Sequence, residues 1–237
     1  MDKELERIKR SWDLSAATDN RMKAVHYTIN GEPLPESIYD DIYEYIHLQL
    51  GFESQDLVLD IGAGSGLLLE RIARNVKVAI GTDISRNMLK LAPRKENLFV
   101  QQMDASALAF GGETFDKVIC NSVIQYLPNL DYFEQYFAEM IRVCKQGGVI
   151  FIGDLFNAYL KDLWTGYQHP LSWRSRLTSL LNQLRGQQDT EYLFIDPRQL
   201  MQWSQQFGCR NFKALLQLSP QKPILHKMFR YDAVITK

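Results

Sequence analysis

The sequence is poor in the patterns that hold metals or disulfides. It has three cysteines in 237 residues, Cys120, Cys144 and Cys209, far apart and without CxxC spacing. An odd, scattered set disfavours both a disulfide framework and a zinc site. The four histidines show neither HxH nor HxxxH spacing. We therefore expect free thiols and no metal site.

Membrane and nucleic-acid signals are also missing. No apolar run reaches the roughly 18 residues that would span a bilayer, and the N-terminal MDKELERIKRSWDLS lacks the apolar core of a signal peptide. A formal net charge of −1 gives no general attraction to nucleic acid or anionic lipid. These absences predict a cytoplasmic protein without nucleic-acid or membrane partners. They leave the oligomeric state open.

The most informative stretch that is present is LVLDIGAGSG, residues 57–66. Its first half is almost continuously apolar, as expected of a strand in a parallel sheet with helices on both faces. Gly62, Gly64 and Gly66 follow at alternate positions, where the missing β-carbons permit positive φ and close approach of a ligand. Taken alone, the stretch also fits an ordinary glycine-rich turn between a strand and a helix.

An acidic residue follows each of the next two predicted strands, at 76–82 and 98–103. Asp83 stands where the acid of nucleotide-binding folds accepts hydrogen bonds from both hydroxyls of a ribose. Asp104 can take the exocyclic amine of adenine, while the backbone N–H of Ala105 serves a ring nitrogen. The alternative for Asp83 is an exposed carboxylate at a strand end. Together these positions predict a nucleoside site.

The remaining sequence continues the alternation of strands and helices. Further strands are expected at 115–120, 149–152, 212–218 and 229–236, and helices at 36–50, 67–74, 131–145 and 197–207. The expected helix ends are Gly51 as a stop, Ser85 as the start of a further helix, Asp131 and Asp196 as caps, and Gly147 with Gly148 between helix 131–145 and the next strand. We expect an α/β fold with a Rossmann-like, seven-stranded, mostly parallel sheet, helices on both faces, an antiparallel C-terminal strand pair and a helical lid insertion. A single domain would comprise an N-terminal helical cover of two pieces joined by a loop (1–50), a core (55–155), the lid (156–192) and a C-terminal helix with two strands (193–237).

The lid is predicted where the strand rhythm fails. Residues 158–190 interleave aromatic side chains, Trp164 and Trp173 among them, with arginines and His169. Such a mixture can bind nucleic acid. Because the overall charge is near neutral, we expect the arginines to lie on a solvated helix face. The aromatic side chains of the lid would cover a compact apolar ligand.

Five motifs come in the order and spacing of a known family: DIGAGSG, GTDIS, QMDAS, FDKVICNSVIQYL and CKQGGVIFIGD. The chain resembles the class I S-adenosylmethionine-dependent methyltransferases, closely over about residues 55–155. The resemblance implies S-adenosylmethionine as cofactor and S-adenosylhomocysteine as product. It also implies a cofactor set formed by Asp60, Gly62, Ala63, Gly64, Gly66, Asp83, Ile84, Met88, Asp104, Ala105 and Asn121.

The reaction expected from this resemblance is an in-line displacement, in which an oxygen or nitrogen of a small-molecule acceptor attacks the sulfonium methyl. His169 is the preferred candidate base, followed by Tyr126, Tyr27 and His26, and the substrate and lid residues would be Tyr27, Tyr126, Trp164, His169 and Trp173. Methylation of RNA or protein is a less favoured possibility. A nicotinamide dehydrogenase is disfavoured because the loop reads GxGxG rather than GxGxxG. A non-catalytic nucleoside-binding module is not excluded by any motif.

Overall fold

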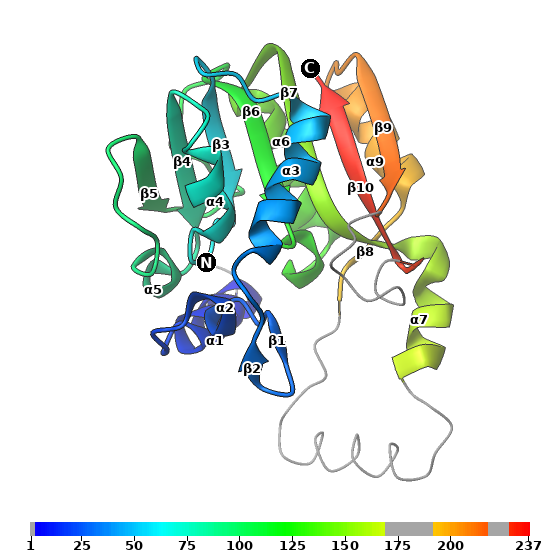
Figure 1. Ribbon diagram of the computed structural model, residues 1–237. Helices are drawn as coiled ribbons and strands as arrows, with labels where there is room; N and C mark the ends of the chain where they lie inside the picture. Colours follow the sequence, from blue (N-terminus) through cyan, green and yellow to red (C-terminus); the bar gives the residue numbers. More distant parts are fainter. Residues whose placement is uncertain (1–2, 169–191, 218–227) are drawn as a thin grey trace.

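The computed structural model describes residues 3–168, 192–217 and 228–237 (Figure 1). Its main sheet has seven strands in the order β5-β4-β3-β6-β7-β10-β9, and the two-residue β8 (Phe194–Ile195) pairs with β7 beside this path. The predicted seven-stranded fold is confirmed. The strands are β3 (Leu57–Ile61), β4 (Val78–Asp83), β5 (Leu98–Gln102), β6 (Phe115–Asn121), β7 (Cys144–Asn157), β9 (Asn211–Leu216) and β10 (Arg230–Thr236).

Strand direction follows the prediction. Strands β5, β4, β3, β6 and β7 are mutually parallel, whereas β10 runs antiparallel to both β7 and β9. The parallel strands therefore bring their carboxyl ends to one edge, where open α/β sheets bind ligands. In Figure 1 this is the lower edge of the sheet.

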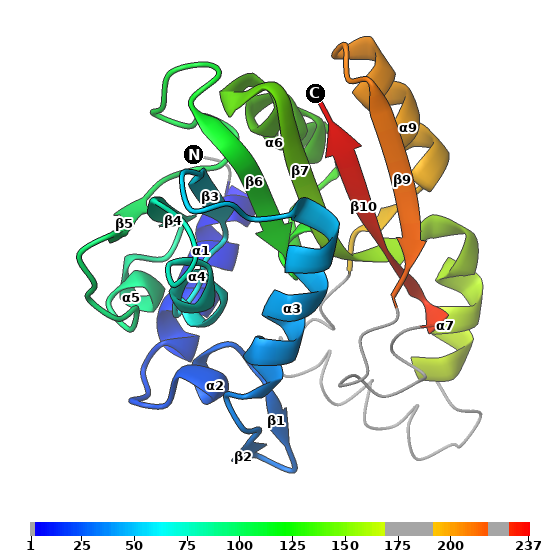
Figure 2. The ribbon, with the colours of Figure 1, turned by 45° about the horizontal axis from the view of Figure 1, so that its top comes forward.

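Two hydrophobic clusters bury the two faces of the sheet. On one face pack α3 (Ile38–Leu50) and α4 (Leu67–Ile72), and on the other α6 (Leu130–Val143) and α9 (Pro197–Gln206). Figure 2 shows α3 in front of the sheet and α6 behind it. Because both faces are covered, β3 is buried along nearly its whole length. That explains its continuous apolar sequence.

Helix ends agree with their sequence signals in three places and differ in one. Gly51 ends α3 with φ +57°, Ser85 caps α5 (Arg86–Leu89), and Asp196 caps α9. The expectation that Asp131 caps α6 is wrong. Asn129 is the cap, because its side chain accepts a hydrogen bond from the Tyr132 N–H, so the helix begins at Leu130.

Strand β7 is longer than the predicted 149–152. It begins at Cys144 and runs through Gly147 and Gly148, which were expected to separate helix from strand. The backbone around these glycines pairs with the C-terminus, since Gly147 N donates to Lys237 O and Lys237 N donates to Gly148 O. These partners are ninety residues away in sequence and gave no local signal.

The N-terminal cover differs from the two helices and a loop that the sequence predicted. It consists of α1 (Lys3–Ser15), α2 (Arg21–Ala24), a hairpin of β1 (Thr28–Ile29) and β2 (Glu32–Pro33), and then α3. The predicted loop is a hairpin because Asn30 and Gly31 both adopt positive φ, as a two-residue Asn-Gly turn requires. Figure 1 shows α1, α2 and the hairpin at the carboxyl edge of the sheet.

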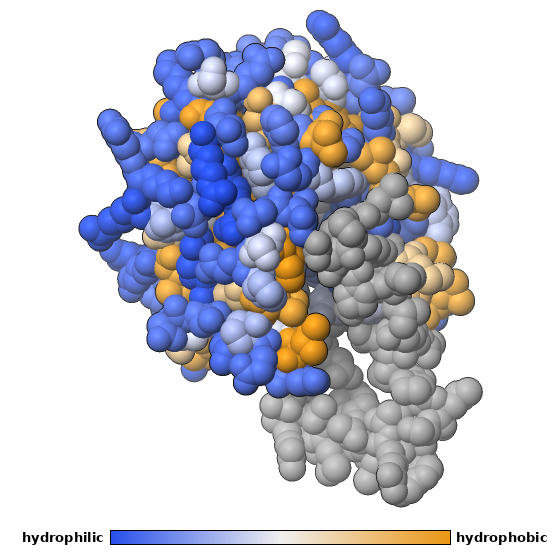
Figure 3. Space-filling view, viewed as in Figure 1, coloured by the Kyte–Doolittle hydropathy of each residue, from blue (hydrophilic) through white to orange (hydrophobic). Residues whose placement is uncertain are grey.

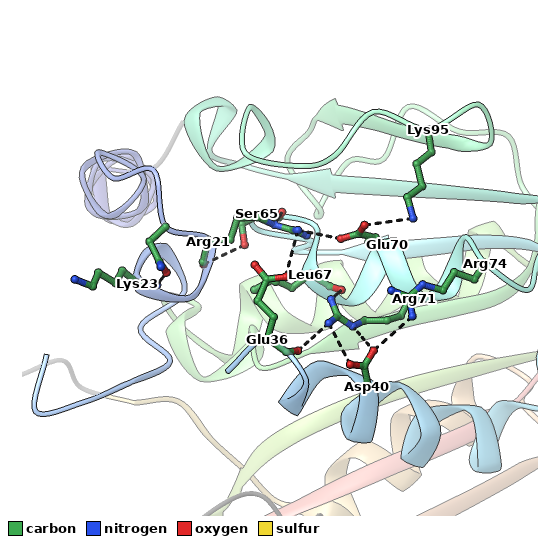
Figure 4. Close-up of polar contacts among 11 residues, drawn as sticks. Arg21, Lys23, Glu36, Asp40, Ser65, Leu67, Glu70, Arg71, Arg74 and Lys95 are labelled. Carbon is green, nitrogen blue, oxygen red and sulfur yellow. Dashed lines mark hydrogen bonds and ion pairs between the residues drawn. The ribbon is translucent and has the colours of Figure 1, made fainter. Parts of the chain in front are cut away.

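Two arginines attach this cover to α4, the helix that follows the glycine loop (Figure 4). Arg21 forms an ion pair with Glu70 (Nη1 to Oε2, 2.9 Å) and donates through Nε to the backbone oxygen of Ser65 (3.2 Å). Arg71 pairs with Asp40 of α3 (2.9 Å) and donates to the Glu36 carbonyl (2.8 Å). The cover is thus held against the loop by charged groups from both sides.

Candidate active site

A cavity of about 820 Å³ lies at the carboxyl edge of the parallel strands. Its walls come from the glycine loop, from the ends of β4, β6 and β7, and from the cover, including α1 and the hairpin. This volume is near the upper end of the roughly 300–1,000 Å³ of small-molecule sites. One cavity therefore has room for two ligands side by side.

The glycine loop needs its glycines for conformation and for space. Gly62, Gly64 and Gly66 all have positive φ. A β-carbon on Gly62 would overlap the side chain of Val123, which also lines the cavity. The Gly62 and Ala63 N–H groups donate to the Thr82 carbonyl at the end of β4 (2.7 and 2.9 Å). The loop is therefore folded back against the next strand, and its surface faces the cavity.

One buried carboxylate, Asp60, and one partly buried carboxylate, Asp83, line the cavity. Asp83 accepts hydrogen bonds from Gly64 N (2.9 Å) and Ser85 N (2.8 Å). Burial raises the pKa of Asp83 to about 6, against the opposing effect of these N–H donors, and the charge of Asp13 raises it further. Burial and the nearby Asp83 charge raise the pKa of Asp60 to about 7. Within the described residues neither carboxylate has an ion-pair partner, which suits a ligand with a positive charge and hydroxyl groups.

Most of the predicted cofactor residues line this cavity. They are Asp60, Gly62, Ala63, Gly64, Asp83, Ile84, Met88, Ala105 and Asn121. Gly66 is not among the lining residues and instead precedes α4 as its N-cap with φ +73°. Its positive φ completes the turn from the loop into the helix.

Asp104 also lies outside the cavity lining. Its Oδ1 accepts hydrogen bonds from Tyr132 OH (2.6 Å) and from the backbone N–H and hydroxyl of Ser106. Tyr132 itself lines the cavity, together with Met103 and Ala105. In this structure Asp104 therefore contacts the site through the tyrosine that it orients.

Three of the four candidate bases line the cavity: His26, Tyr27 and Tyr126. His26 has φ +59°, stacks on Trp12 (centroids 5.2 Å apart) and places Nε2 2.9 Å from Ser15 Oγ. Burial lowers the pKa of His26, so its imidazole is neutral at pH 7. Burial raises the pKa of Tyr126 to about 12, so its hydroxyl stays protonated. These two rings and Trp12 form one aromatic wall, since Trp12 also meets Tyr126 edge-on.

The predicted lid residues are placed differently. Trp164 of α7 (Lys161–Gln168) does not line the cavity, because its ring packs against Phe156, Phe229 and Tyr192. His169 and Trp173 lie outside the described residues. Of this cluster, Tyr192 reaches the cavity.

The structure adds an ion-paired group that was absent from the predicted site. Ser122 follows β6 with φ +60°, and Asp154 lies in β7 with φ +70°. The Ser122 hydroxyl donates to Asp154 Oδ2 (2.7 Å). Arg230 of β10 pairs with the same oxygen (2.5 Å) and lies over the Phe156 ring. Ser122 and Asp154 could have been suspected from their positions at strand ends. Arg230 gave no sequence signal, because it comes from the antiparallel strand.

The charges of the cavity fit S-adenosylmethionine better than a dinucleotide. Among the described residues the charged groups lining it are Asp60, Asp83, Asp154 and Arg230, and Arg230 is paired with Asp154. The described lining therefore offers no cation without an ion-pair partner to hold a pyrophosphate. Ile84, Met88 and Met103 offer apolar contacts for an adenine ring. Over the same described ranges no cluster of three metal-type ligands occurs, and no helix has the length and hydropathy of a membrane span.

Comparison with known proteins agrees with this geometry. A family model described as a methyltransferase domain matches residues 59–152. Chondramide synthase cmdD of Chondromyces crocatus is 32% identical over 75% of this chain, which corresponds to 5% of that protein. A ubiquinone biosynthesis O-methyltransferase of Mesorhizobium japonicum is 33% identical over 54% of this chain and 53% of its own length. A phosphatidylethanolamine N-methyltransferase of Cereibacter sphaeroides is 33% identical over 50% of this chain and 63% of its own.

The chain thus spans from 5% to 63% of the length of these relatives. Among solved structures, phosphoethanolamine N-methyltransferase 1 of Haemonchus contortus, in complex with phosphoethanolamine and S-adenosylhomocysteine, superposes with a TM-score of 0.66 at 13% identity. The match covers 98% of this chain and 48% of that one, and it shows a shared fold. Residues 59–152 are thus a methyltransferase domain, and the chain has the fold of the class I S-adenosylmethionine-dependent methyltransferases.

Proposed function

We propose that this chain transfers the sulfonium methyl group of S-adenosylmethionine to an oxygen or nitrogen of a small-molecule acceptor. The observation that carries the proposal is the single cavity that joins Gly64 and Asp83, at one end, to Tyr126 and Tyr192 at the other. The cofactor supplies an activated methyl group and a good leaving group. The protein has then to position two ligands in line and to exclude water.

Different residues of the chain bind the ribose, attract the cationic end of the cofactor and cover the site. Asp83 is held by two backbone N–H groups and faces the cavity with its remaining acceptor capacity, which fits ribose hydroxyls. Asp60 places a negative charge in the same space, which fits the cationic end of the cofactor. Trp12 of α1 contacts both His26 and Tyr126, so α1 covers the position between the two ligands.

A base is required only by some acceptors. An amine attacks without strong base assistance, whereas a hydroxyl benefits from a base with a pKa near the operating pH. His26 is neutral at pH 7 and lies in the cavity, so it is the described residue best suited to receive a proton. We expect His26→Asn, which tolerates positive φ, to lower kcat about 100-fold for a hydroxyl acceptor. An unchanged kcat, with a loss in His169→Ala instead, would transfer the role to His169.

Small molecules fit the cavity better than RNA or protein acceptors. The site is concave and lined mostly by apolar and aromatic side chains. The relatives named above include an O-methyltransferase and an N-methyltransferase. Their names support either acceptor atom for this chain and do not choose between them.

Two measurements test the proposal. Isothermal titration with S-adenosylmethionine, S-adenosylhomocysteine and NAD should give binding of the first two and none of the third. Purified protein incubated with radiolabelled S-adenosylmethionine should then label one or more members of a panel of phenols, amines and carboxylic acids. Cofactor binding without any transfer would favour a non-catalytic binding module, and efficient labelling of RNA or protein alone would refute the small-molecule assignment.

A further inference from the structure

The acceptor half of the cavity has an apolar wall. Ile29 of β1, Leu34 and Ile38 line it on the side of the hairpin and the start of α3. Ile29 is 59% exposed although it is one of the most hydrophobic residue types. The space-filling view shows hydrophobic surface at the hairpin (Figure 3). This wall suits the apolar body of a ligand, because burying it there removes hydrophobic surface from water.

The charges at this end disfavour an anionic ligand. Arg230 is the one cationic side chain among the described lining residues. Its guanidinium pairs with Asp154 and lies 4.1 Å from the centroid of the Phe156 ring. Among the described lining residues three carboxylates, those of Asp60, Asp83 and Asp154, face this one cation, so a phosphate or carboxylate would enter a cavity with an excess of negative charge. An uncharged or cationic ligand meets no such repulsion.

Gln125 provides an unused hydrogen-bond acceptor. It belongs to the short helix η1 (Ile124–Tyr126), lines the cavity and is 2% exposed. Its side-chain oxygen Oε1 is buried without a hydrogen-bond partner. The residue is held independently of that oxygen, because its backbone carbonyl accepts a hydrogen bond from Leu193 N (2.9 Å). A buried carbonyl oxygen is stable only when a donor reaches it, and a bound ligand with an N–H or O–H supplies one.

We infer that Gln125 selects the acceptor, its Oε1 accepting a hydrogen bond from an N–H or O–H of a molecule that carries no negative charge. The apolar body of that molecule packs on Ile29, Leu34 and Ile38. The acceptor class is thus a phenol or an amine with an apolar substituent, and phosphorylated or carboxylated acceptors are rejected. The inference rests on the proposed function and adds a specificity-determining residue to it.

The test measures binding of four matched probes to protein saturated with S-adenosylhomocysteine. The probes are 4-butylphenol, 4-butylbenzylamine, 4-butylanisole and 4-butylbenzoate, which share one tail and differ in donor and charge. We expect the phenol or the amine to bind at least tenfold more tightly than the anisole, which has no donor, and than the anionic benzoate. A preference for the benzoate, or no binding of phenol and amine, would overturn the inference.

Variants assign the effect to the residues. Gln125→Leu should remove the preference for phenol or amine over anisole, whereas Gln125→Glu, which keeps an acceptor oxygen, should retain it for the amine. Gln125→Met serves if the leucine variant does not fold. Ile29→Ser should weaken all uncharged probes about threefold to tenfold. Leu48→Ser, a change at a residue 78% exposed and outside the cavity, should change nothing.

The outcome is separable from that of the proposed function. Binding of S-adenosylhomocysteine and methyl transfer to any acceptor report on the proposed function alone. A Gln125→Leu protein that binds S-adenosylhomocysteine normally and still prefers phenol over anisole would refute the role of Gln125 and leave the methyltransferase assignment standing.

Discussion

The two halves of the cavity are built in different ways. The cofactor half uses the backbone of the glycine loop and two acids at the carboxyl ends of strands β3 and β4, Asp60 and Asp83. The acceptor half uses side chains from the cover, from η1 and from Arg230 of β10. The first half depends on conformations that few residues can adopt, whereas the second depends on which side chains meet. We therefore expect substitutions in the first half to weaken cofactor binding and those in the second to change selectivity for the acceptor.

The largest effect should come from Gly62→Ala. The new β-carbon would overlap Val123 at a position with φ +78°, so both strain and a clash oppose the native loop. We expect affinity for S-adenosylmethionine to fall about 100-fold or more, measured by isothermal titration. Gly147→Ala is the matched control, because it has φ +76° and nothing within 4 Å of the added carbon.

The double variant Gly62→Ala, Val123→Ala then separates clash from strain. Removing the Val123 methyl groups should restore part of the lost affinity if the overlap is responsible. Equal losses in Gly62→Ala and Gly147→Ala would show that the close approach at Gly62 is unimportant.

Asp60→Asn should have the next largest effect, because it should weaken cofactor binding and raise the stability of the ligand-free protein. Loss of the negative charge should weaken S-adenosylmethionine binding about tenfold at pH 8. The pKa of Asp60 is about 7 in the folded, ligand-free protein and near 4 in the unfolded chain, so ionising Asp60 costs free energy only in the folded state. The free energy of unfolding therefore falls as the pH rises from about 4 to 7. Asp60→Asn should therefore raise Tm more at pH 8 than at pH 5.5.

Thermal unfolding at both pH values and titration of cofactor at pH 8 check this prediction. In wild type, affinity for S-adenosylmethionine should rise from pH 5.5 to 8 as Asp60 and Asp83 ionise, and Asp60→Asn should flatten that rise. A Tm at pH 8 that is lower in Asp60→Asn than in wild type would contradict the prediction that the Asp60 carboxylate destabilises the ligand-free protein.

The smallest effect is expected at Arg21, which attaches the N-terminal cover to α4 and the glycine loop. Arg21→Gln removes the pair with Glu70 and the donor to Ser65 O, and both contacts are largely shielded from water. We expect a loss of about 1 kcal/mol in the free energy of unfolding, measured in urea, and faster release of S-adenosylhomocysteine. Arg7→Gln, whose partner Glu4 is exposed on α1, should lose almost nothing. Equal changes in both variants would show that the cover is not anchored through Arg21.

The residues of the cofactor half are predictable from the sequence to a greater extent than those of the acceptor half. Local signals predict the positions of Asp83 at a strand end, of Ser85 as a helix cap and of Gly51 as a helix stop. The prolines and the Asn-Gly pair near residue 30 predict a loop, whereas the structure has a hairpin, for which an Asn-Gly pair is also a turn signal. Its strands have only two residues each, too few to show alternation.

Contacts between distant segments gave no such signal. The position of Asp104 after a strand predicts a place at the adenine edge, whereas in the structure Asp104 accepts a hydrogen bond from Tyr132 of α6 and does not line the cavity. Arg230 has no sequence pattern that marks it as a site residue, and Gln125 is marked only as a member of NSVIQYL, the stretch that follows a strand's carboxyl end. Gln125 acquires its meaning from burial, and Arg230 from its pairing with Asp154 across two strands.

The sequence by itself determined the sheet, the glycine loop and the acids at its strand ends, because hydrophobic period, glycine φ and strand-end position are local properties of the chain. Only the tertiary structure decided the acceptor half. Whether a side chain is buried, paired or left without a partner depends on segments brought together from α1, η1 and β10, and that pairing is fixed by packing rather than by any local pattern.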